Sequence, residues 1–212
     1  MDLKGLTINF LGDSITEGSG TSAPDKVFHQ IIKEKYNLKH AYNYGIGGTR
    51  IARQLKPTEA CPRHDLYFEL RAESMDRNAD AVVVFGGTND YGHGDAPFGE
   101  LDSEDIYTFC GAVNSLINKL LKDYPKAKIV FMTPLHRLNE TIPLEPQNKT
   151  LEEYVNEIRK ICKKRGVAVI DLFEINPLDP SNAELVPDGL HPNDKGHIVM
   201  ADVIAKELIK II

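Results

Sequence analysis

Hydrophobic and polar positions along the chain alternate between short apolar runs and longer stretches with helical periodicity. Ala81–Phe85 is an almost continuous apolar run, as is typical of a strand covered on both faces. Five segments are predicted to be strands: Leu6–Leu11, Ala41–Tyr44, Ala81–Phe85, Lys128–Met132 and Val167–Asp171.

The segments between these strands have apolar residues at helical spacing. Thr150 and Glu153 form a capping box, and Gly166 provides a helix stop. We expect helices over Asp25–Tyr36 (opened by Pro24), Asp65–Met75, Ser103–Tyr124 as the longest, the stretch from Thr150 to Gly166, and Asp194–Ile211.

Strands that alternate with helices predict parallel crossovers, and hence an α/β fold. We expect a three-layer α/β/α sandwich around a five-stranded parallel sheet. Residues 1–212 contain no internal repeat and no second composition zone, which favours a single domain. Two long loops remain, Gly86–Asp102 and Thr133–Lys149, and loops of this length in compact domains are usually functional.

The composition narrows the class of protein. With 42% hydrophobic and 26% charged residues, the chain has the composition of a soluble globular domain. The net charge of −6 and the lack of a basic stripe argue against a nucleic-acid partner. No apolar stretch approaches the roughly 20 residues that a membrane span needs. The sequence does not indicate an oligomeric state.

Cysteine usage and the first residues bear on the compartment. The chain has three cysteines, and this low, odd number argues against a disulfide framework. Cys110 and Cys162 are predicted to be core thiols. The segment that begins at Met1 lacks the apolar region of a signal peptide. We therefore expect a cytoplasmic protein, unless a signal peptide has been removed.

Reactive side chains follow the predicted strands. In a parallel sheet, ligands bind outside the carboxyl ends of the strands, where these segments would meet. A hydroxyl, closely spaced backbone amides, a carboxamide and an Asp/His pair are what acyl transfer needs. They occur in Gly12–Ser14 after the first strand, Asn43–Thr49 after the second, Gly86–Asp90 after the third and Asp188–Pro192 before the last helix.

Each of these motifs also has a structural interpretation. Gly12–Ser14 could simply be a turn that closes a strand, and Asn89 could cap backbone groups in a tight turn. Asp188 could bond local amides while His191 lies on the surface. The functional interpretation depends on the occurrence of all four motifs in one order.

Together the motifs resemble the sequence blocks of the SGNH/GDSL hydrolase family, across Gly12 to Pro192. The resemblance implies a flavodoxin-like SGNH hydrolase fold with Ser14 as nucleophile and His191 and Asp188 as its acid–base partners. It also implies an oxyanion hole formed by the Ser14 and Gly48 backbone N–H groups and the Asn89 amide. Glycine at position 48 would let the backbone approach the substrate closely. No cofactor is implied.

Other motifs are incomplete. Gly45–Gly48 resembles a dinucleotide-binding loop, but Arg50 occupies the position of its third glycine. Cys61 beside His64 is a weak candidate for a thiol nucleophile. Four residues, Asp90, His93, Asp95 and His136, have no recognisable metal-ligand spacing, so no metal is expected. Because His93 and His136 lie on the long loops, they are the histidines most apt to contact substrate.

The predicted function is that of a serine esterase acting on a small-molecule or carbohydrate ester. The segments expected around Ser14 are polar and include Thr16, Glu17, Ser19 and Asp90, which favours a short, acetyl-like acyl group on a polar alcohol. Within the family, lysophospholipase and thioesterase activities are the alternatives. From other classes, the alternatives are a non-catalytic carbohydrate-binding relative and a metal-dependent phosphoesterase.

Overall fold

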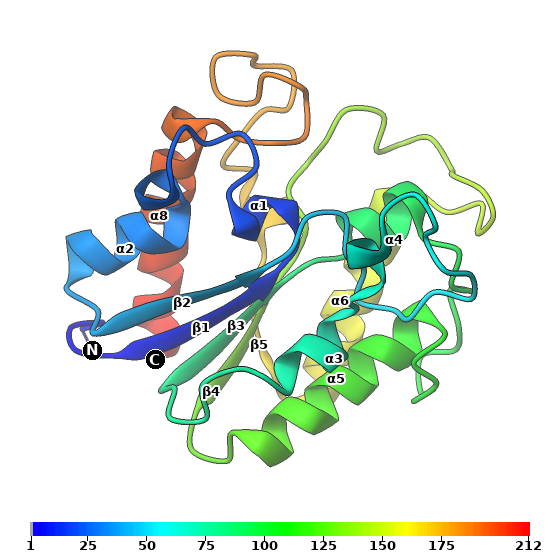
Figure 1. Cartoon of the computed structure of the whole chain (residues 1–212), viewed down its shortest axis with the longest axis horizontal. Coiled ribbons are helices and arrows are strands. Elements are labelled where there is room, and N and C mark those ends of the chain that lie inside the picture. Colours follow the sequence, from blue (N-terminus) through cyan, green and yellow to red (C-terminus); the bar gives the residue numbers. More distant parts are fainter. Residues whose placement is uncertain (1) are drawn as a thin grey trace.

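The structure is a computed structural model that describes residues 2–212 (Figure 1). Its sheet has five parallel strands in the order β2-β1-β3-β4-β5. This is the flavodoxin-like order, and it confirms the expected α/β class. The strands are β1 (Thr7–Gly12), β2 (His40–Gly45), β3 (Ala81–Phe85), β4 (Lys128–Met132) and β5 (Ala168–Ile170).

Helices cover both faces of the sheet: α2 and α8 lie on one side, and α3, α5 and α6 on the other (Figure 1). Two 3₁₀ turns, η1 (Pro24–Lys26) and η2 (Pro62–Asp65), lie in the connections. The helices are α1 (Ser14–Glu17), α2 (Phe28–Tyr36), α3 (Phe68–Ala72), α4 (Thr88–His93), α5 (Phe109–Asp123), α6 (Leu151–Arg165), α7 (Leu172–Ile175) and α8 (Asp194–Ile211). No helix within residues 2–212 is both long and apolar enough to cross a bilayer.

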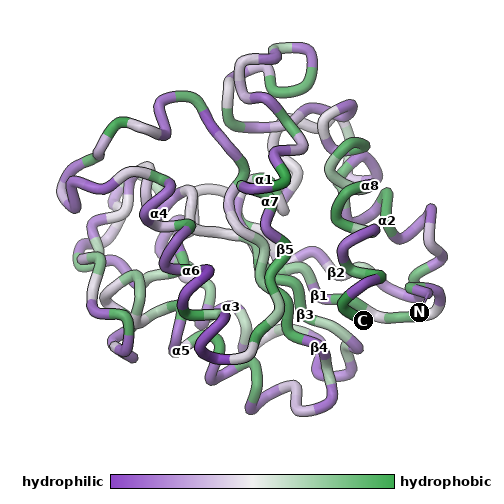
Figure 2. The backbone as a smooth tube through the Cα atoms, turned by 180° about the vertical axis from the view of Figure 1, so that it is seen from behind, coloured by the Kyte–Doolittle hydropathy of each residue, from purple (hydrophilic) through white to green (hydrophobic). Residues whose placement is uncertain are grey.

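The core consists of two apolar clusters separated by the sheet. Along β3, Val82 and Val84 point into the cluster beneath α3, α5 and α6. The alternate residues Ala81, Val83 and Phe85 point into the cluster beneath α2 and α8. Because both faces are covered, β3 is apolar throughout, and Figure 2 shows the strands as a hydrophobic centre inside more polar helices.

Several predicted boundaries are confirmed. Strands β3 and β4 and helix α8 have the expected bounds. The capping box forms: the Thr150 backbone N–H donates to Glu153 Oε2 (2.9 Å), and the Thr150 side chain accepts from the N3 backbone. Gly166 ends α6 with φ +66°, a conformation that favours glycine.

The prediction of a helix from Ser103 was wrong. Helix α5 begins only at Phe109, and α8, with 18 residues, is longer than α5, with 15. In the segment before α5, the Asp105 N–H donates to Ser103 Oγ (3.1 Å) and the Tyr107 N–H donates to Asp105 Oδ1 (3.0 Å). These short polar side chains occupy backbone donors that a helix would need, and Thr108 then caps the helix.

Two other predicted helices are shorter than expected. In the first, Pro24–Lys26 forms a 3₁₀ turn, and Val27 is extended before α2 begins. In the second, η2 ends at Asp65 and α3 spans only Phe68–Ala72. The four- to six-residue helices α1, α4 and α7 were not predicted, because one turn is too short to produce a periodic pattern.

Cys110 and Cys162 are buried in the core, as predicted, with 1% and 0% of their surfaces exposed. Burial raises the pKa of each thiol to about 12, so both are un-ionised at neutral pH.

Two histidines are enclosed between α2, α8 and the sheet. The Gln30 side chain donates to His29 Nδ1 (3.0 Å), so the ring of His29 donates from Nε2 to the Thr16 carbonyl (3.0 Å). The Phe28 N–H donates to His197 Nδ1 (3.1 Å). Burial lowers the pKa of each imidazole to about 4, so both are neutral at pH 7.

The two buried imidazoles should make the stability of the fold sensitive to acid. Their folded-state pKa of about 4 lies below the unfolded value of 6.5, so the unfolded chain binds protons first as the pH falls. Each ring should therefore lower the free energy of unfolding between pH 6.5 and 4, by at most about 3 kcal/mol. Urea unfolding of His29→Gln and His197→Gln across this range should show a shallower pH dependence than the wild type.

His40→Gln serves as the control because His40 is exposed at the amino end of β2. If the unfolding free energies of both buried-site variants depend on pH as steeply as that of the wild type, the acid sensitivity does not arise from these rings.

Candidate active site

Ser14 lies where β1 ends and α1 begins, at the rim formed by the carboxyl ends of the strands (Figure 1). Asp13 caps α1 by accepting from the Ile15 N–H (3.1 Å), which fixes the turn that presents Ser14. Ser14 is only 7% exposed. Its position is the switch point of the sheet, because β1 pairs with β2 on one side and with β3 on the other.

The structure brings Ser14, His191 and Asp188 into one hydrogen-bonded chain. His191 Nε2 lies 2.9 Å from Ser14 Oγ, across 177 positions of sequence. On the other side of the ring, His191 Nδ1 lies 2.7 Å from Asp188 Oδ2. This is the arrangement of a nucleophile, a base and a group that orients the base.

The Asp188 carboxylate determines the direction of these hydrogen bonds. Partial burial raises its pKa, but hydrogen bonds from the backbone and ring of His191 and from the Leu190 N–H oppose this, and the net pKa is lowered. Because an ionised carboxylate only accepts, Nδ1 of His191 is the donor to it. In the neutral ring Nε2 must then accept, so the Ser14 hydroxyl donates to His191.

Three hydrogen-bond donors lie on Ser14 itself and on the segments that follow β2 and β3, which leave the sheet at the same end. The Asn89 side chain donates from Nδ2 to the Thr49 carbonyl (3.0 Å), which ties α4 to the loop after β2. An amide has two N–H bonds, so a second one is left for another acceptor. Within residues 2–212, the backbone N–H groups of Ser14 and Gly48 donate to no acceptor.

The environment of Gly48 differs from the expectation. Its φ of +74° favours glycine, but the space where a Cβ would stand is filled by the ring of His64, whose atoms would lie 2.3–2.6 Å from it. The absence of a side chain at Gly48 therefore makes room for His64. The sequence indicates His64 only as a residue near Cys61, not as a neighbour of Gly48.

The end of β2 and the loop after it pack tightly on α1, and this packing requires Gly45 and Gly47. A Cβ at Gly45 would lie 2.2 Å from the Glu17 backbone nitrogen. A Cβ at Gly47 would lie 2.8 Å from Glu17 Oε2, which accepts from the Gly47 N–H (2.7 Å). These glycines thus serve loop packing against the segment that carries Ser14.

The carboxylates considered as metal ligands bind backbone groups instead. Asp90 is buried and accepts from the Ile51 and Ala52 N–H groups, both at 3.0 Å. Asp95 accepts from the Leu55 and Lys56 N–H groups (2.8 and 3.0 Å). Within residues 2–212, no three His, Cys, Asp or Glu side chains gather in a way that could hold a metal ion.

His93 and His136, the loop histidines expected near substrate, have different environments. His136 contacts Glu140 through Nδ1 (2.6 Å) and the Phe173 carbonyl through Nε2 (2.9 Å), so both ring nitrogens are engaged within the protein. His93 accepts at Nδ1 from Arg50 Nη1 (3.1 Å), and its ring centroid lies 5.9 Å from that of His64. Only His93 stays close to the Gly48 loop.

Sequence reasoning missed Arg71, a buried cation beneath the site. Its guanidinium donates to the carbonyls at the ends of β1 and β2, Gly12 O (3.0 Å) and Tyr44 O, and to Thr49 Oγ1 (2.9 Å). Its Nε donates to the Leu66 carbonyl (2.8 Å). One side chain therefore ties together two strand ends and the loop that carries Gly48.

Arg71 also acts on a buried acid. Burial raises the pKa of Asp13, the residue before Ser14, to about 7, although the positive charge of Arg71 opposes the rise. In turn, burial lowers the pKa of Arg71 to about 10, so it remains charged at neutral pH. Nothing in the sequence distinguishes Arg71 from an exposed helix arginine, because its partners lie up to 59 residues away.

Comparison with known proteins gives a consistent family match. A sequence model of the GDSL-like lipase/acylhydrolase family matches residues 10–199. Platelet-activating factor acetylhydrolase IB subunit alpha1 of Rattus norvegicus is 28% identical over 148 residues, which is 69% of this chain and 50% of that protein. An acetylxylan esterase of Xylanibacter ruminicola is 24% identical over 94% of this chain and 42% of that protein. The chain thus spans about half the length of the curated relatives it matches.

A solved structure from Lactobacillus plantarum agrees over the full length. It superposes with a TM-score of 0.83 at 25% identity, and covers 100% of this chain and 99% of that one. The similarity includes every element that carries a residue of the Ser14–His191–Asp188 chain.

Arg71 should be needed for stability and for the placement of Ser14 and Gly48. Arg71→Lys keeps the charge but cannot reach all four acceptors, so several of these hydrogen bonds are lost. We expect a loss on the order of 2–4 kcal/mol in the free energy of unfolding, measured in urea. Arg77→Lys is the matched control, because Arg77 forms an exposed ion pair with Asp123 and should change stability by less than about 1 kcal/mol. Equal stabilities of the two variants would contradict this assignment.

Proposed function

The chain belongs to the GDSL-like lipase/acylhydrolase family, and we propose that it is a serine-dependent carboxylic ester hydrolase acting on short acyl esters. Its substrate is an acetyl-like ester of a polar alcohol or carbohydrate. The observation that carries the proposal is the hydrogen-bonded chain from Ser14 Oγ through His191 to Asp188, at 2.9 and 2.7 Å.

The proposed reaction begins with attack of Ser14 Oγ on the ester carbonyl. His191 Nε2 accepts the hydroxyl proton as the new C–O bond forms, and Asp188 stabilises the resulting imidazolium. The negative charge on the carbonyl oxygen is held by the N–H groups of Ser14 and Gly48 and by the Asn89 amide.

Collapse of this intermediate breaks the bond to the alcohol. His191 returns the proton to the departing alkoxide, and an acyl group remains on Ser14 as an ester. Water then attacks that ester while His191 accepts one of its protons. As the bond from the acyl carbon to Ser14 Oγ breaks, His191 passes this proton to Oγ, which releases the carboxylic acid and restores the serine. No step requires a group beyond these side chains and water.

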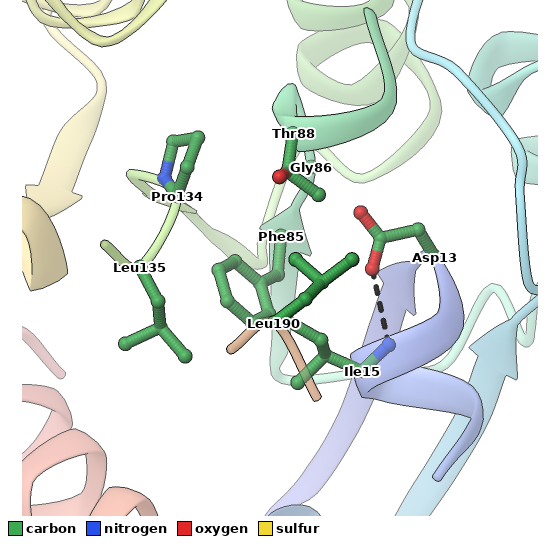
Figure 3. A pocket seen from close by; sticks show the side chains of 8 residues that line it. All are labelled: Asp13, Ile15, Phe85, Gly86, Thr88, Pro134, Leu135 and Leu190. Atoms are coloured by element: carbon green, nitrogen blue, oxygen red, sulfur yellow. Dashed lines mark hydrogen bonds between the residues drawn. The ribbon is translucent and has the colours of Figure 1, made fainter. Parts of the chain in front are cut away.

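A narrow apolar pocket beside Ser14 supports a short acyl group. Asp13 and Ile15, the neighbours of Ser14, line one side, and Leu190, the neighbour of His191, crosses it (Figure 3). The remaining walls are Phe85, Gly86, Thr88, Pro134 and Leu135. About 230 Å³ between these residues is free of atoms, but it has no room for a water-sized sphere. An acetyl group could enter if Leu190 shifts slightly, whereas a long chain would have to displace many of the surrounding side chains.

The names of the relatives point the same way. One acts, by its name, on the acetyl ester of platelet-activating factor and the other on acetylated xylan. The alcohols differ, but the acetyl group is common to both. Thr16 and Asp90, which were expected among the polar residues around Ser14, are buried. The Glu17–Arg63 ion pair and the ring of His64, at the loop after β2, favour an alcohol with several hydroxyl groups.

Replacement of the nucleophile or the base tests the mechanism. Ser14→Ala and His191→Ala should each fold normally and lower kcat toward short acyl esters by at least about 10³-fold, because the members of such a chain act as a unit. The loss of kcat is measured as hydrolysis of 4-nitrophenyl acetate by the purified variants. Thermal melting checks that each variant is folded. His40→Ala should keep full activity, because His40 is exposed at the opposite end of the sheet. A folded Ser14→Ala protein with substantial activity would exclude the mechanism.

Acyl length provides a second test. The wild-type kcat/KM should fall from acetyl to hexanoyl esters of one alcohol, because the pocket closes behind the acetyl group. Leu190→Ala should raise the hexanoyl-to-acetyl ratio by roughly tenfold, since each buried CH₂ contributes about 0.8 kcal/mol. Ile198→Ala, on the exposed side of α8, should leave the ratio unchanged. A steady rise in wild-type kcat/KM with chain length would instead favour a lysophospholipase or thioesterase.

A further inference from the structure

His64 is held directly over Gly48. Its ring fills the space that a Cβ at Gly48 would need, with Nε2, Cδ2 and Cε1 at 2.3–2.6 Å from that position. Any carbonyl oxygen that accepts from the Gly48 N–H must therefore bind within a few ångströms of this imidazole. His64 is half-buried, and its side chain forms no hydrogen bond within residues 2–212.

The residues on either side of His64 anchor it. Arg63 forms an ion pair with Glu17, which also accepts from the Gly47 N–H. Asp65 accepts from the buried Arg50 (3.1 Å) and from the hydroxyl and backbone N–H of Thr58 (2.6 and 2.7 Å). The short η2 turn is thus fixed on both sides, and the ring of His64 keeps its place while both of its nitrogens remain available.

A second imidazole lies next to the first. Arg50 Nη1 donates to His93 Nδ1 (3.1 Å), so the neutral ring of His93 carries its proton on Nε2. The two ring centroids are 5.9 Å apart. Partial burial and the guanidinium groups of Arg50 and Arg63 lower the pKa of His64 below its usual range. A neutral imidazole can donate one hydrogen bond and accept another.

The sheet order places this cluster opposite the acyl pocket. The pocket is lined by residues that follow β1, β3 and β4. His64 packs on the loop after β2, and β2 and β3 are on opposite sides of β1. The two substituents of an ester carbonyl also point in different directions. With the acyl group in the pocket, the β2 side of Ser14, where His64 packs on Gly48, is the side left for the alcohol.

We propose that His64, assisted by His93, forms a binding site for the hydroxyl groups of the leaving alcohol and gives the enzyme its selectivity for polyhydroxylated esters such as acetylated sugars. This rests on the proposed esterase function. His64 contacts the alcohol and discriminates between alcohols, whereas Ser14 and His191 carry out the bond changes common to all esters.

Two acetates of matched shape test the proposal: an acetylated methyl pyranoside and cyclohexyl acetate, which has a six-membered ring without hydroxyl groups. The wild type should prefer the pyranoside in kcat/KM. His64→Ala should lose about tenfold of that preference, as expected for one to two hydrogen bonds, mainly through KM. His64→Phe should lose it equally, because phenylalanine keeps the packing on Gly48 but has no donor or acceptor.

His40→Ala is the control, and thermal melting checks the folding of each variant. The proposal is overturned if the wild type shows no preference between the two acetates, or if His64→Phe retains the wild-type preference. A change in the acetyl-to-hexanoyl ratio of His64→Ala without a change in alcohol preference would place His64 on the acyl side and also overturn it. Failure of the esterase function is distinguishable, because then Ser14→Ala would hydrolyse both acetates as well as the wild type.

Discussion

The site depends on the parallel register at the end of β1. Gly12 pairs with Gly45 on one side and with Phe85 on the other, so three chain segments leave the sheet at the same level. The approach is close: a Cβ at Gly12 would lie 2.0 Å from Thr16 Oγ1 and 2.9 Å from the Phe85 carbonyl. Glycine at this position lets α1 fold back over the strand ends, and this turn presents Ser14 between the loops that carry Gly48 and Asn89.

Buried polar side chains hold these loops in place. Arg71 joins the ends of β1 and β2, Asp90 holds two backbone N–H groups after the Gly48 loop, and Arg50 connects that loop to η2. Each is a charged group removed from water, which is tolerated because backbone groups or opposite charges satisfy it. Such networks fix the loops more narrowly than apolar contacts would, and the positions of Gly48 and His64 follow from them.

This arrangement divides the surroundings of Ser14 into two unlike halves. On the β4 side lies an apolar pocket closed by Leu190 and Leu135. On the β2 side lie two imidazoles and several charged residues, held by Arg50 and Glu17. A single ester can therefore present its apolar acyl group to one half and a polar alcohol to the other, which is the basis for both substrate proposals.

The sequence by itself determined the five strands, the last helix, the fold class and the family, because apolar runs and short motifs are local patterns. It also pointed to Ser14, Asp188, His191, Gly48 and Asn89, since their order along the chain matches the family blocks. Helix starts such as that of α5 were misplaced, because Ser103 and Asp105 bond their own backbone in a stretch with helical composition.

Only the tertiary structure decided how the loops are held and what surrounds Gly48. Arg71 and Asp90 could not be assigned from the sequence, because a buried charge is identified by its partners, and most of these lie 22 to 59 residues away. The same holds for His64, which meets Gly48 through the packing of η2 on the loop after β2. Periodicity and motifs report on neighbours along the chain, whereas the contacts of a binding site depend on segments that meet only after folding.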